Sequence, residues 1–211
     1  MTTDGTESVE PSATYTRTGD DGTTTLGDGS RTGKADLRIV AYGETEEASA
    51  AIGLTIALGS SLTDPVIILL SRVQNDLLDL GADLCAPVDP TAGSPSPAVR
   101  IDDGYVARLE RACDHFNQGL PGLASFVVPG GTTTAAMLHQ ARTVVRRAER
   151  STAEAVRECG DTMNPTVGAY LNRLSSLLFI LARSENAEHS DTLWQPGLST
   201  SCSDFELWER H

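Results

Sequence analysis

The sequence predicts an all-α protein, a five-helix bundle whose helices run up and down beside one another. Apolar residues recur at helical spacing in several segments, and Pro- and Gly-rich breaks separate these segments. No stretch gives a convincing sheet pattern. The chain has 211 residues, which is enough for one domain with a substantial core. Together these observations point to a helical bundle.

The helices are expected over residues 37–59, 65–85, about 102–117, roughly 132–159 and roughly 165–185. The first is rich in Ala and other small residues, which suits close packing. Asp64 and Pro65 form a typical N-cap and first-turn pair before the second. Three threonines open the fourth, and Asn-Pro opens the fifth. Residues 1–14 are expected to be a disordered leader, 15–185 the helical domain and 186–211 a polar tail.

Composition excludes several classes of function. The net charge of −13 disfavours a nucleic-acid partner, because phosphate-backbone binding needs a basic surface. No apolar run approaches the roughly 18 residues of a membrane span. The acidic N-terminus lacks the basic start and apolar stretch of a signal peptide.

The cysteines and histidines give no sign of a metal centre. Cys85, Cys113, Cys159 and Cys202 lie far apart without a CxxC motif, which indicates free thiols in a reducing cytoplasm. The histidines show no metal-ligand spacing either, so the sequence identifies no metal ligands.

The fourth helix carries a cationic face opposite its apolar stripe. Arg142, Arg146 and Arg150 lie on this face together with Glu149. Arginines so grouped suit bidentate contact with a polyphosphate, but a solvated face with i,i+4 pairing explains them as well. The apolar stripe consists of Met137, Leu138, Ala141, Val144, Val145 and Ala148.

The fifth helix, with the stretch "YLNRLSSLLFILAR", is apolar almost all round and is expected to be central. Asn172 lies within this stretch, near Arg173 and Ser176. A buried amide that lacks hydrogen bonds costs roughly 1–3 kcal/mol. Either a polar network in the core or a ligand would satisfy it.

The stretch "TRTGDDGTTTLGDGSRTGK", residues 16–34, suggests a phosphate cradle. It fails the Walker A pattern, because Asp28 stands where the first glycine is needed and Ala35 follows Lys34. Backbone amides, hydroxyls and a lysine can still surround phosphates. An ordinary surface loop explains the same composition.

Three long segments in a fixed order resemble the PduO-type ATP:cob(I)alamin adenosyltransferases. They are "YTRTGDDGTTTLGDGSRTGKADLRIVAYG", then "SFVVPGG" with "LHQARTVVRRAER", and "YLNRLSSLLFILAR". The resemblance runs from about Tyr15 to Arg183, and "LWQPG" at 193–197 also looks familial. It implies an alkyl transferase that forms homotrimers with ATP bound between neighbouring subunits.

The resemblance implies roles for two groups of residues. Residues 15–34 would wrap ATP through Thr16, Arg17, Thr18, Gly19, Thr24, Thr25 and Lys34. The ATP site would be completed by Arg146, Arg147, Glu149, Arg150 and Asn172. Arg142 would form an ion pair with Glu46 across a subunit boundary.

The implied reaction needs no protein nucleophile. Cob(I)alamin attacks the 5′ carbon of ATP and expels triphosphate, and Mg²⁺ shares the work of charge stabilisation. Phe126 matches the aromatic residue that removes the lower axial ligand from cobalt(II), although by itself it would be interpreted as a loop anchor in the core. A flavin reductase and a B12-dependent mutase are the partners implied.

Departures from the family pattern support a second hypothesis. Residues 46–50 read Glu-Glu-Ala-Ser-Ala where the family has Asp-Glu-Leu-Asn-Ser, and Ser176 replaces a carboxylate. These changes are compatible with a protein that binds adenosylcobalamin and delivers it to a mutase with little catalysis.

Overall fold

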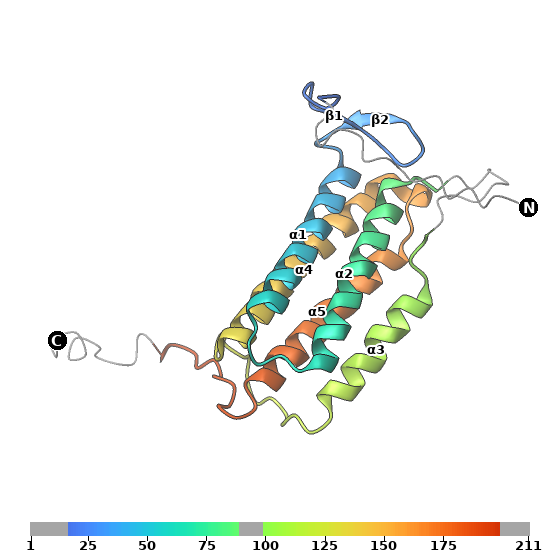
Figure 1. Ribbon diagram of the computed structural model, residues 1–211. Coiled ribbons are helices and arrows are strands. Elements are labelled where there is room, and N and C mark those ends of the chain that lie inside the picture. Colours follow the sequence, from blue (N-terminus) through green and yellow to red (C-terminus); the bar gives the residue numbers. More distant parts are fainter. Residues whose placement is uncertain (1–16, 89–98, 199–211) are drawn as a thin grey trace, which may run out of the picture.

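The computed structural model is a bundle of five helices with a small β-hairpin at one end (Figure 1), and it describes residues 17–88 and 99–198. The helices are α1 (Leu37–Leu58), α2 (Asp64–Cys85), α3 (Asp103–Asn117), α4 (Thr133–Cys159) and α5 (Thr166–Glu185), with a short 3-10 helix, η1 (Gly160–Thr162). The predicted five-helix bundle is therefore confirmed. The expected leader, Thr16 and Cys202 lie outside the described residues.

The helices pack around one continuous apolar core. Helix α1 packs against α2 and α4, and α5 packs against α3 and α4. Helix α5 is the most deeply placed, as its composition predicts, and Leu174, Leu177 and Leu178 in it are fully buried. In the part of the chain that the structure describes, no helix is long and apolar enough to cross a membrane.

Local capping decides where most helices begin. The Asp102 carboxylate accepts hydrogen bonds from two backbone N–H groups of the first turn of α3, and the Thr132 hydroxyl accepts one from Ala135 in α4. For α2 the expected cap is wrong by one position. Thr63 is the N-cap, and Asp64 is the first helical residue, where its charge favours the helix dipole.

The expectation of no sheet is wrong for residues 23–33. Strands β1 (Thr23–Thr25) and β2 (Arg31–Gly33) pair antiparallel, with Thr24 opposite Thr32. The turn between them is stabilised by Asp28, whose carboxylate accepts hydrogen bonds from the backbone N–H and hydroxyl of Ser30. Gly29 supplies the positive φ of 84° that this turn requires.

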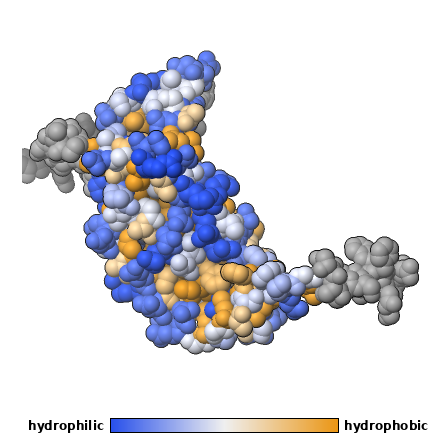
Figure 2. Space-filling model, turned by 180° about the vertical axis from the view of Figure 1, so that it is seen from behind, coloured by the Kyte–Doolittle hydropathy of each residue, from blue (hydrophilic) through white to orange (hydrophobic). Residues whose placement is uncertain are grey.

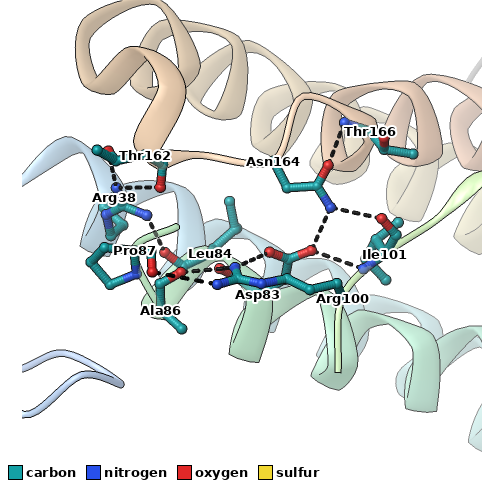
Figure 3. A network of polar contacts seen from close by, with 10 residues as sticks. All are labelled: Arg38, Asp83, Leu84, Ala86, Pro87, Arg100, Ile101, Thr162, Asn164 and Thr166. Carbon is teal, nitrogen blue, oxygen red and sulfur yellow. Dashed lines mark hydrogen bonds and ion pairs between the residues drawn. The ribbon is translucent and has the colours of Figure 1, made fainter. Parts of the chain in front are cut away.

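A buried polar network fixes the hairpin end of the bundle (Figure 3). Asp83, fully buried near the end of α2, pairs with Arg100 at 2.5 Å and accepts hydrogen bonds from Ile101 N–H and the Asn164 amide. Arg38 in α1 donates to the carbonyls of Leu84 and Thr162. The network joins α1, α2 and the segment between α4 and α5, so the base of the hairpin rests on rigid structure.

Candidate functional site

Two arginines on α4 and the facing side of α5 line a pocket of about 270 Å³. Arg142 and Arg146, one helical turn apart, contribute its cationic wall. Helix α5 contributes the opposite wall through Ser175, Ser176, Phe179 and Ile180. The pocket therefore combines guanidinium groups, hydroxyls and one aromatic ring.

The positive charge of this pocket is not neutralised within the described residues. Arg142 Nε is buried without a hydrogen-bond partner, and its guanidinium carbon lies 5.9 Å from the centroid of the Phe179 ring. Burial lowers the pKa of Arg142, and the neighbouring Arg146 cation lowers it further. No hydrogen bond or ion pair of the Arg146 guanidinium occurs in residues 17–88 and 99–198. Such a pair of cations favours a bound polyanion.

Asn172 lies beside this pocket but is exposed, so the expectation that it is buried is wrong. Its neighbours Leu171 and Leu174 face the core, and Asn172 points along the seam between α5 and α4. There its Nδ2 donates a 2.7 Å hydrogen bond to Glu149 Oε1. Arg150, which follows Glu149 directly, donates to the backbone carbonyl of Arg146 one turn earlier in α4. Asn172 and Glu149 of the predicted ATP residues are thus neighbours in space.

Arg147 points away from this group, toward α1. It forms an ion pair with Glu47 and lies 3.9 Å from Glu44. The hydrogen bond that Arg147 donates to the Glu47 carboxylate raises the pKa of Arg147. Glu46 is exposed, and no ion pair of its carboxylate occurs in the described part of the chain.

The predicted N-terminal ATP residues gather around the hairpin. A Cβ on Gly19 would lie 2.9 Å from the Thr23 carbonyl oxygen, so the backbone leaves room only for glycine here, and Lys34 Nζ would lie 3.1 Å from the same Cβ. Arg17 adopts a positive φ of 60° at the start of this loop. Thr24 and Thr25 lie on β1, and Thr18 lies in the loop that precedes it.

Arg31 is a residue of this region that the sequence analysis did not single out. It donates to the Thr18 carbonyl at 3.0 Å and to the Thr23 hydroxyl, and it lies 3.6 Å from Asp21. Hydrogen bonds from Thr23 lower the pKa of Asp21. Arg31 lies opposite Thr25 in the hairpin, and this position could have identified it only if the pairing of the two strands had been known from the sequence.

The hairpin and the α4 pocket lie apart within one chain. Figure 1 shows the hairpin beyond the start of α1, whereas Arg146 lies near the middle of α4. The structure therefore arranges the predicted ATP residues in two groups on different parts of the bundle surface.

Phe126 is 77% exposed, which overturns its interpretation as a core anchor. Its ring centroid lies 6.0 Å from that of Trp194, which is also half-exposed. Figure 2 shows hydrophobic side chains gathered near the point where the C-terminal segment leaves the bundle. The large exposed apolar residues of these loops are Leu123, Phe126, Val128, Trp194 and Leu198. An exposed apolar patch of this kind marks a place where a ligand or another protein surface can bind.

Comparison with known proteins identifies the class. The family model described as cobalamin adenosyltransferase matches residues 14–185, so the chain belongs to the cobalamin adenosyltransferase family. Within this family it is similar to corrinoid adenosyltransferases of the PduO type.

Relatives and solved structures agree over most of the chain. A corrinoid adenosyltransferase of Mycobacterium bovis is 52% identical over 186 residues, 87% of this chain and 93% of the relative. The Bos taurus corrinoid adenosyltransferase MMAB is 36% identical, and the alignment covers 80% of this chain and 69% of that relative. A PduO-type ATP:corrinoid adenosyltransferase of Lactobacillus reuteri, a variant with one phenylalanine replaced by alanine, was solved in complex with cobalamin and ATP. It is 34% identical with a TM-score of 0.77, and the match covers 86% of this chain and 98% of that one.

Proposed function

We propose that this chain transfers the 5′-deoxyadenosyl group of ATP to the cobalt of cob(I)alamin and releases triphosphate. The observation that supports this most strongly is the pair of uncompensated guanidinium groups, Arg142 and Arg146, in a pocket that also presents an aromatic ring. One side of such a pocket suits the phosphates of ATP and the other suits a planar apolar ligand. The enzyme is favoured over the alternative delivery protein by the family it belongs to.

The ATP site is proposed to be shared between subunits of a homotrimer. The hairpin around Lys34 and the arginines of α4 lie apart in one chain, so a second copy would bring one group to the other. A row of exposed apolar residues on α1, formed by Val40, Leu54 and Leu58, is available for this contact. In the assembly Glu46 of one subunit would pair with Arg142 of the next and satisfy its buried Nε.

The reaction forms a cobalt–carbon bond and breaks the bond from C5′ to the triphosphate oxygen. Both electrons of the new bond come from cobalt(I), and the electrons of the broken bond leave with triphosphate. The protein therefore supplies orientation and charge stabilisation and needs no nucleophile of its own. We assign Arg146 and Lys34 to the developing charge on the leaving group.

Magnesium would arrive with ATP. In the described residues no group of three His, Cys, Asp or Glu side chains is placed to hold a metal ion. Mg²⁺ is commonly bound by substrate phosphates with few protein ligands. Near Arg146, the Glu149 carboxylate and the pocket hydroxyls of Ser175 and Ser176 carry oxygen atoms that could add to such coordination. When bound, the ion would offset charge on the triphosphate.

Phe126 is proposed to face the lower side of the corrin ring. Its 77% exposure and the neighbouring Trp194 leave an apolar edge that can displace the lower axial ligand. Four-coordinate cobalt(II) accepts an electron more readily, which would bring its reduction within reach of a flavin reductase. We further infer a cytoplasmic location, in accord with the free thiols of Cys85, Cys113 and Cys159, and a B12-dependent mutase as recipient of the product.

The test is turnover followed by the change in corrin absorbance, with chemically reduced cobalamin, Mg²⁺ and ATP. Wild-type protein should turn over, and Arg146→Ala should lower the rate by about 100-fold or more, as expected for loss of a charge stabiliser. Arg157→Ala, on the same helix but in an exposed pair with Glu154 and Glu158, is the matched control and should leave the rate unchanged. No turnover by wild-type protein, or a wild-type rate in Arg146→Ala, would contradict the proposal.

A further inference from the structure

Phe126 sits in a two-stranded contact that is built almost entirely from backbone. We call residues 125–128 and 192–194 together the Phe126 bridge. The Phe126 carbonyl accepts a 2.7 Å hydrogen bond from Trp194 N–H, and Val128 N–H donates to the Thr192 carbonyl at 2.8 Å. Ser125 Oγ donates to the Trp194 carbonyl at 2.9 Å. The position of Phe126 therefore depends on where residues 192–194 are held.

One buried guanidinium holds both strands of this bridge. Arg183, in the last turn of α5, donates from Nε to Asp191 Oδ2 at 2.8 Å, directly before residues 192–194. Its Nη2 donates to the Pro121 carbonyl at 2.6 Å, shortly before residues 125–128. The side chains of Arg183 and Asp191 are only 6% and 10% exposed. The guanidinium of Arg183 thus binds the segments that precede both strands of the bridge and connects them to the end of α5.

The bridge has few apolar contacts on either side, so the Arg183–Asp191 ion pair contributes more to holding it in place. A pocket of about 330 Å³ lies beside the end of α5, and its wall includes residues 119–123, Arg183, Asp191 and, from the bridge, Leu193. On the front, Phe126 and Trp194 face solvent. A segment with a pocket on one side and solvent on the other has few apolar contacts to fix it.

We propose that Arg183 and Asp191 are positioning residues for Phe126, and that their ion pair sets the geometry in which Phe126 displaces the lower ligand of cobalt(II). This inference rests on the proposed function, in which Phe126 acts on the corrin. Loss of the pair should leave ATP binding and the attack by cobalt(I) intact. Asp191 and Arg142 both lie near His139, but in the described residues no hydrogen bond or ion pair joins Arg183 or Asp191 to Arg142 or Arg146. It should impair the cobalt(II) step alone.

The experiment compares two substrates in the same variants. Asp191→Asn removes the charge of the pair, and Val128→Pro removes one hydrogen bond of the bridge without touching the pair. Glu110→Gln is the control. It removes the charge of an exposed ion pair between α3 and Arg173, which lies on α5 like Arg183. Each protein is checked for helical content and then given cobalt(II) cobalamin with ATP, for the spectrum of the four-coordinate species, and cobalt(I) cobalamin with ATP, for turnover.

We expect both variants to lose about tenfold in the four-coordinate signal and in turnover from cobalt(II) with a mild reductant, and to stay within about twofold of wild type from cobalt(I). The control should match wild type in both. If Asp191→Asn does not fold, Arg183→Lys takes its place, because lysine keeps the charge but lacks the fork that reaches both Asp191 and the Pro121 carbonyl. The inference is wrong if either folded variant keeps the wild-type signal, or if turnover from cobalt(I) falls equally. A wild-type protein without the four-coordinate signal would instead refute the role of Phe126 itself, and the inference with it.

Discussion

His139 lies on the buried side of α4, and it is 2% exposed with neither ring nitrogen hydrogen-bonded in the described residues. Its neighbours are the Phe179 ring of α5 at 6.0 Å, the Arg142 cation one turn along α4 and the Asp191 carboxylate from the C-terminal segment. Burial lowers the pKa of His139, Arg142 lowers it further, and Asp191 opposes both. The imidazole is therefore neutral at pH 7 and adds no third positive charge behind the pocket.

This pKa shift predicts a pH-dependent stability. The folded pKa of His139 lies below the ordinary value of 6.5, so below that pH the unfolded chain binds the proton more readily than the folded chain. The free energy of unfolding should consequently fall as the pH drops from 6.5 toward 5, with His139 contributing a slope of up to about 1.4 kcal/mol per pH unit. Urea unfolding at several pH values measures it.

The contribution of His139 is isolated by substitution. His139→Gln cannot titrate, so its stability should change less steeply over this interval than that of wild type. His115→Gln, at an exposed position of α3, is the matched control and should keep the wild-type slope. An unchanged slope in His139→Gln would show that the proton goes elsewhere.

Single residues of the candidate site differ in how far the sequence determined them. Spacing alone placed Arg142, Arg146 and Glu149 on one face of α4, because helical geometry is local. It could not show that Asn172 is exposed, since that depends on how α5 rotates against α4. It could not show that Phe126 is exposed either, because an apolar residue between Pro and Gly looks the same in a core or on a surface.

At the scale of elements, the segment that leads into α4 is held by hydrogen bonds to Asn186, the residue just beyond α5. The Asn186 amide is 3% exposed; its Oδ1 accepts from Thr132 N–H and its Nδ2 donates to the Gly130 carbonyl, both at 3.0 Å. Gly131 lies against it at φ 101°. A Cβ at this position would come within 2.1 Å of Asn186 Oδ1. The start of the arginine-bearing helix is thus fixed to the end of its neighbour.

Gly131→Ala should accordingly destabilise the fold by about 2 kcal/mol or more, because it combines left-handed backbone strain with a clash against a buried amide. Gly168→Ala is the matched opposite. Gly168 lies in the first turn of α5, and a Cβ there would meet nothing within 4 Å. It should stabilise by about 0.5–1 kcal/mol through helix propensity. Midpoints of urea unfolding measure both effects. Equal effects of the two substitutions would contradict the inference that Gly131 is required by its contact with Asn186.

Elements were predictable from the sequence to different degrees. The helix starts followed from local capping residues such as Asp102 and Thr132. The hairpin was missed because three-residue strands are too short to show alternation, and only Asp28-Gly29 marked its turn. The network of Asp83, Arg100 and Asn164 joins residues far apart in the chain, so no local pattern could reveal it.

For the whole molecule, the separation of the hairpin from the α4 arginines has the largest consequence. Each group is well ordered on its own support, the hairpin on the end of α2 through the bond from Gly27 N–H to the Cys85 carbonyl, and the arginines on a core helix. Neither group offers a complete nucleotide site. Two copies arranged head to tail would complete one, and closure of that arrangement gives a ring such as the proposed trimer.

The shared site is tested most directly by mixing two inactive proteins. Arg146→Ala leaves the hairpin intact and Lys34→Ala leaves the α4 arginines intact, and each alone should be inactive. Co-expression in equal amounts should restore roughly a quarter of wild-type turnover, because random assembly joins an intact hairpin to an intact α4 in that fraction of interfaces. A mixture that stays as inactive as its parents, although mixed oligomers form, would mean that each chain builds its site alone.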